Sequence, residues 1–161
     1  MAVDDIDYVV AAWRESGQWS AAPLPPRAAE SLENLIHALR QLPGEGGVIG
    51  LVSIVEDVFV VLRVNGSEVR ICMSDATAGD DFEIAAEIVD LVGNPFDEDS
   101  DEAQPTVVGE LGLLADLGMK APDLLELCED GEEEIDDVFS EIAETLGFAK
   151  EFERAREEAG R

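Results

Sequence analysis

Histidine is the residue type that most often performs acid–base catalysis at neutral pH, and His37 is the single histidine of the chain. Its neighbourhood has helical periodicity, and at 3.6 residues per turn His37 lies about 140° around the helix from Leu32. It therefore points away from the apolar stripe, where Glu33, one turn earlier, could pair with it at the surface. A lone exposed histidine predicts no catalytic triad.

The two cysteines, Cys72 and Cys128, could form a disulfide or hold a metal. They are far apart in the sequence, and neither belongs to a CxxC pair. This spacing predicts neither a disulfide framework nor a zinc site. We expect two buried, reduced thiols, because free cysteine is among the most buried residue types.

Three alternating carboxylates, Asp97, Asp99 and Asp101, match the first three ligand positions of an EF-hand loop. The match then fails, because the sixth position is Glu102 instead of glycine and the twelfth is Val108 instead of glutamate. The sequence predicts no dedicated calcium site.

A second group of acids, Asp75, Asp80 and Asp81, could hold magnesium in a metal-dependent hydrolase. Acids at a helix start more often act as caps, which is the interpretation that we favour. The chain has no GxSxG elbow, phosphate-binding loop or GxGxxG turn, and the glycine-rich residues 44–47 precede a strand. We therefore predict no catalytic, cofactor-binding or metal-binding residues and keep the hydrolase as an alternative.

Charge is the outlying property of the composition, with 38 acidic and 10 basic residues and a net charge of −28. The part up to Asp75 holds 11 acidic and 5 basic residues, and the part after it holds 27 and 5. Such a field repels phosphate backbones and anionic membranes, and it attracts and steers basic proteins. From residue 129 to residue 149 there is no basic residue, which argues against DNA recognition there.

The start of the chain has no basic segment followed by a long apolar one, and no segment approaches the length of a membrane span. We expect a cytoplasmic protein that contacts neither membrane nor nucleic acid directly. With 46% hydrophobic residues in a chain of 161, it can bury a real core.

Alternating apolar residues predict a strand over residues 6–14, a turn at Ser16-Gly17 and a returning strand over residues 19–24. Residues 48–73 contain three apolar runs, of which residues 48–55 are apolar enough for a central strand. If Asn65-Gly66 forms a two-residue type I′ loop, Leu62 lies opposite Val69, Val60 opposite Ile71, and Arg63 makes a solvent-facing ion pair with Glu68.

Helical periodicity covers residues 27–42, 80–92 and 135–146, with shorter helices opening at Pro122 and near Phe148. The predicted fold class is α+β, an antiparallel sheet of about five strands with packed helices and a helical C-terminal part. We expect an α+β core over residues 1–95, a flexible acidic loop over residues 96–106, and a helical part over residues 107–161 packed on the same domain.

Four strings in one consistent order resemble the bacterial family of tRNA adenosine deaminase-associated proteins. They are LIHALRQLPGE at residues 35–45, GLVSIVEDVFVVLRV at residues 50–64, GELGLLADLGM at residues 109–119, and the LGF…F pattern at residues 146–152. The resemblance implies association with the tRNA-editing deaminase. The chain is not itself that enzyme, because it lacks the HxE…PCxxC pattern of zinc deaminases.

The resemblance and the charge together predict a non-catalytic accessory protein that needs no cofactor. Its expected partner is a basic protein, with a tRNA-modifying adenosine deaminase as the leading candidate. A homo-oligomer formed through the apolar C-terminal helices is a further alternative. The acidic surface that we expect to meet the partner comprises Asp97, Glu98, Asp99, Asp101, Glu102, Glu132, Glu133, Glu134, Asp136 and Asp137.

Overall fold

The structure is a computed structural model that describes residues 6–42, 47–54, 58–66, 68–74, 83–92, 107–129 and 134–159. Its centre is an antiparallel sheet with the strand order β2-β1-β3-β4-β5-β6. The strands are β1 (Ile6–Glu15), β2 (Gln18–Leu24), β3 (Val48–Ile54), β4 (Val58–Asn65), β5 (Glu68–Met73) and the two-residue β6 (Val108–Gly109). The predicted α+β class with an antiparallel sheet is confirmed.

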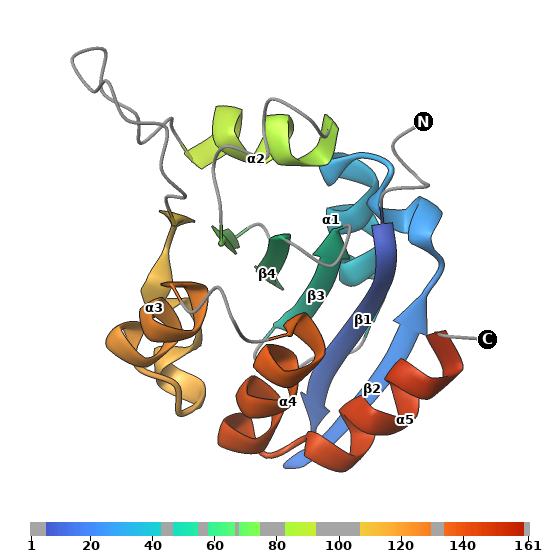
Figure 1. Ribbon diagram of the computed structural model, residues 1–161. Helices are drawn as coiled ribbons and strands as arrows, with labels where there is room; N and C mark the ends of the chain where they lie inside the picture. Colours follow the sequence, from blue (N-terminus) through green and yellow to red (C-terminus); the bar gives the residue numbers. More distant parts are fainter. Residues whose placement is uncertain are drawn as a thin grey trace.

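Helices cover both faces of this sheet (Figure 1). The chain forms the 3₁₀ helices η2 (Pro26–Ala29) and η4 (Leu111–Leu117), and the α-helices α1 (Leu32–Arg40), α2 (Glu83–Val92), α3 (Ala121–Glu129), α4 (Ile135–Leu146) and α5 (Ala149–Ala159). Residues of α1 and α2 share one hydrophobic cluster with the sheet, and residues of η4, α3, α4 and α5 share a second. The two clusters give a helix–sheet–helix sandwich.

The alternation of β1 explains both clusters. Val9 and Ala11 pack into the cluster with α1 and α2, whereas Tyr8, Val10 and Ala12 pack into the other, because successive side chains of a strand point to opposite faces. β3 is buried along its whole length, as predicted for a central strand. At the middle of the second cluster, the Phe139 ring makes edge contacts with Tyr8, Phe59 and Phe152.

The first hairpin turns at Ser16-Gly17, as predicted. Both residues have positive φ, 52° and 79°, which is the requirement of a type I′ turn. The register predicted for the second hairpin is wrong, because Asn65, which was predicted to lie in the loop, still pairs with Glu68. Leu62 therefore faces Ile71 and Val60 faces Met73, a shift of two residues from the predicted register.

The predicted helix over residues 27–42 is two elements, η2 and α1. Ser31 between them has extended backbone, and its side chain accepts a hydrogen bond from the Asn34 N–H at 3.1 Å. This N-cap starts α1 at Leu32 because it satisfies a backbone donor that has no partner within the helix. The helices predicted at Pro122, at residues 135–146 and near Phe148 are confirmed as α3, α4 and α5.

Among the described residues, no helix is both long and apolar enough to pass through a membrane.

Candidate functional site

Seven of the ten acids predicted to meet a partner lie outside the residues that the structure describes: Asp97, Glu98, Asp99, Asp101, Glu102, Glu132 and Glu133. The other three, Glu134, Asp136 and Asp137, are described at the start of α4. The acids considered as magnesium ligands, Asp75, Asp80 and Asp81, also lie outside the described residues.

A row of four exposed carboxylates follows the outer face of α4, and we call it the α4 acidic stripe. It consists of Glu134, Asp137, Glu141 and Glu144. Spacings of four and three residues keep Asp137, Glu141 and Glu144 within about 60° around the helix axis, and Glu134 is the N-cap residue directly before the helix. Within the described part of the chain, none of the four takes part in an ion pair. Glu141 and Glu144 were absent from the predicted surface, although their spacing opposite the apolar stripe was visible in the sequence.

Asp136 has a different role from its neighbours in α4. Its Oδ1 accepts a hydrogen bond from the Tyr8 hydroxyl at 2.5 Å and another from Arg156 Nε at 3.1 Å. The Arg156 guanidinium carbon also lies 4.0 Å from the centre of the Tyr8 ring. Burial and the Asp136 hydrogen bond raise the pKa of Tyr8 above its ordinary value. The cluster joins β1, α4 and α5. The Asp136 carboxylate therefore already has an ion-pair partner, Arg156, within the molecule.

The predicted solvent-facing ion pair between Arg63 and Glu68 is wrong, because Arg63 is buried. It lies in β4 with 8% exposure and pairs across the ladder with Arg70 instead of Glu68. Its guanidinium donates to both carboxylate oxygens of Asp116 and, at 2.9 Å, to the Leu113 carbonyl. The Arg63 hydrogen bonds hold the pKa of Asp116 below its usual range. The side chain faces inward because η4 covers this side of the sheet.

Cys72 and Cys128 are brought together by the fold, with their Sγ atoms 4.0 Å apart. Both are free thiols, as predicted, with Cys72 buried in β5 and Cys128 half-buried in α3. The contact with Cys128 and burial both raise the pKa of Cys72, which keeps it a neutral thiol. The described residues contain no group of three or more histidine, cysteine, aspartate or glutamate side chains that could hold a metal ion.

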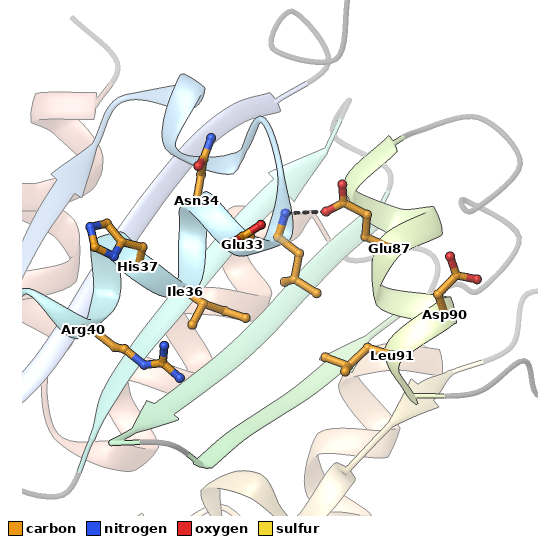
Figure 2. Close-up of a pocket in the computed structure, with 9 residues that line it drawn as sticks. Glu33, Asn34, Ile36, His37, Arg40, Glu87, Asp90 and Leu91 are labelled. Carbon is orange, nitrogen blue, oxygen red and sulfur yellow. Dashed lines mark hydrogen bonds between the residues drawn. The ribbon is translucent and has the colours of Figure 1, made fainter.

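A groove of about 620 Å³ separates α1 from α2 on the opposite side of the sheet from α4 (Figure 2). Ile36 from α1 and Leu91 from α2 extend into the space between the helices. Glu87 closes one end, where its Oε2 accepts a hydrogen bond from the Leu32 backbone N–H at 2.5 Å. We call this space the α1–α2 groove.

His37 also lines this groove and is exposed, as predicted. The expected ion pair with Glu33 does not form, although both side chains lie on the solvent side of α1. Arg40 lies at the end of the groove and donates from Nε to the Gly66 carbonyl at 2.9 Å. The described surfaces thus offer exposed carboxylates and, between α1 and α2, a groove that contains apolar side chains, and both can bind another molecule.

Comparison with known proteins places the chain in a family. The family model described as Rv3753c-like tRNA adenosine deaminase-associated protein matches residues 7–149. Protein Rv3753c of Mycobacterium tuberculosis H37Rv is 36% identical over 155 residues, which cover 96% of this chain and 90% of that protein. No solved structure matches the chain. The match along nearly the whole chain shows that it belongs to the Rv3753c-like tRNA adenosine deaminase-associated protein family.

Proposed function

We propose that this chain is a non-catalytic accessory protein of the cytoplasm that binds a tRNA adenosine deaminase through an acidic surface. The surface comprises the α4 acidic stripe together with the acids at residues 97–102 and 132–133. Asp136 contributes less than its neighbours, because Arg156 already compensates its charge. The family name supplies the class of partner.

The single observation that carries the proposal is the exposed, unpaired state of the α4 acidic stripe. Four carboxylates on one helix face repel one another, and this repulsion is relieved when cations approach. A protein surface rich in Lys and Arg is such a source of positive charge. A net charge of −28 extends the attraction beyond contact distance and accelerates encounter with a basic partner.

An enzyme that binds tRNA needs Lys and Arg on its RNA-facing surface, because these residues replace the counterions of the phosphates. That basic surface is the complement of the α4 acidic stripe. We propose that the chain covers the RNA-binding surface of the deaminase, either competing with tRNA or sheltering the surface before tRNA arrives. The chain itself contacts no nucleic acid in this scheme.

Co-purification at two salt concentrations tests the proposal. The tagged chain, expressed with the deaminase of the same organism, should retain it at about 50 mM salt and release most of it at about 500 mM, since screening weakens exposed charge pairs. The control is the deaminase passed over the same resin without the tagged chain. Failure to recover folded deaminase at low salt would contradict the proposal.

A further inference from the structure

We propose that the α1–α2 groove binds a segment of a partner protein in which an aliphatic or aromatic side chain stands next to lysine or arginine. This site goes beyond the proposed function, because the groove lies on the opposite side of the sheet from the α4 acidic stripe. The segment is defined by its chemistry, so we expect any protein that carries such a segment to bind. Three properties of the groove favour this ligand.

The first property is an apolar anchor point. Leu91 is 58% exposed, and within the described part of the chain it is the one large hydrophobic side chain that is exposed. Ile36, half-buried in α1, extends into the same space. An apolar side chain inserted between Ile36 and Leu91 would remove all three groups from water, which is the main driving force of protein association.

The second property is unneutralised negative charge on both sides of the groove. Glu33 on α1 and Asp90 on α2 are exposed, and neither takes part in an ion pair within the described residues. Glu87 adds a third carboxylate at the end of the groove. Lysine or arginine beside the inserted side chain would reach these carboxylates, whose attraction is strengthened where the segment excludes water.

The third property excludes anionic ligands. A phosphate or carboxylate in the groove would meet three acids, the His37 imidazole and one guanidinium, and that guanidinium, on Arg40, is already hydrogen-bonded to the Gly66 carbonyl. The groove is also open to solvent and bounded by two helix faces, so it suits a length of peptide chain. A basic segment with one apolar anchor satisfies all three properties.

Two synthetic peptides of equal charge test the proposal with the full-length chain. One has the repeat Lys-Leu-Leu-Lys and the other has glycine in place of each leucine. We expect the leucine peptide to bind about tenfold more tightly at about 0.15 M salt, because burying one leucine side chain gives an effect of that order. Leu91→Ser should reduce this ratio to near one, and Leu91 is exposed enough for the variant to fold.

A pair of neutralising variants separates the groove from the general acidity of the chain. Asp90→Asn should weaken binding of the leucine peptide about threefold, whereas Asp123→Asn, at an exposed position of α3, should leave it unchanged. Equal affinity for the two peptides, or equal losses in the two variants, would overturn the proposal by showing charge attraction alone. The deaminase is absent from this experiment, so its outcome is independent of the proposed function.

Discussion

Tyr8 is the single tyrosine of the chain, so its ionisation can be followed by tyrosinate absorbance near 295 nm without interference from another tyrosine. Because burial and the Asp136 hydrogen bond raise its pKa, we expect no tyrosinate in the native protein at pH values where the denatured chain titrates, near 10.0. The folded pKa lies above the unfolded one. The Tyr8 contribution to the free energy of unfolding is therefore complete below pH 10 and is lost as the pH rises above it.

Tyr8→Phe provides the control, since it removes the absorbance change and the part of the dependence of stability on pH that comes from Tyr8. The variant should lose about 1.5 kcal/mol of unfolding free energy at neutral pH, the lower end of the range for one hydrogen bond to a charged group. Titration of Tyr8 near pH 10 in the folded protein would show that the cluster with Asp136 and Arg156 does not form in solution.

The Arg63–Asp116 pair should contribute to the free energy of unfolding with the opposite pH dependence from that of Tyr8. The Asp116 pKa is lowered from 3.8 by Arg63, so its contribution is present above that value and is lost as the pH falls below it. Asp116→Asn should cost about 1 kcal/mol in urea unfolding at pH 7, a modest figure because the Asp116 side chain is 61% exposed.

The cost of Asp116→Asn should shrink progressively as the pH falls below 3.8, because protonation of wild-type Asp116 then removes its advantage over asparagine. Asp123→Asn, an exposed acid of α3, should show no such dependence. A loss of equal size at every pH would mean that Arg63 does not act through the Asp116 charge. The sequence could not reveal this pair, since the two residues are 53 positions apart. Alternation along a strand also does not show whether other elements cover both faces of the sheet.

At the level of elements, Gly109 in β6 is a position that only glycine fits. Its φ is +103°, and an added Cβ would lie 2.0 Å from the Ile71 carbonyl oxygen. Gly109→Ala should therefore cost at least about 2 kcal/mol of unfolding free energy, since both backbone strain and a clash with β5 result. The measurement is urea unfolding followed by circular dichroism.

Gly112→Ala is the matched control for that change. Gly112 lies three residues away in η4, and an added Cβ there meets nothing within 4 Å. This variant should stay within about 0.5 kcal/mol of the wild type, as surface substitutions usually do. If both variants lose the same amount of stability, the loss at position 109 does not come from backbone strain and a clash with β5.

The existence and type of most elements followed from periodicity, but exact register and boundaries did not. The Asn65-Gly66 pair is a strong hairpin signal, yet Asn65 belongs to the ladder, where it pairs with Glu68, while Gly66 takes the positive φ of +62°. The alternation of β4 is preserved by a two-residue shift in pairing, so the apolar pattern alone cannot distinguish the two registers. Ser31 likewise divides the predicted helix, because its extended backbone and its N-cap hydrogen bond start α1 at Leu32.

For the molecule as a whole, a net charge of −28 means that self-repulsion opposes the compact state. We expect the free energy of unfolding to increase when sodium chloride is raised from about 20 mM to about 300 mM, since the Debye length falls below the spacing of many surface charges. Sodium sulfate would also strengthen apolar burial, so the chloride salt is the appropriate one. Stability that falls with chloride would show that attractive pairs outweigh the repulsion.

The central claim is that the α4 acidic stripe binds the deaminase, and the affinity of the two purified proteins tests it most directly. The variant Glu134→Gln/Asp137→Asn/Glu141→Gln/Glu144→Gln is compared with Asp123→Asn/Glu126→Gln/Glu153→Gln/Glu157→Gln, which removes the same charge from exposed positions of α3 and α5. We predict that the stripe variant binds at least about tenfold more weakly, and that the control changes affinity less than about threefold. Equal affinities for the wild type and the stripe variant would contradict the account.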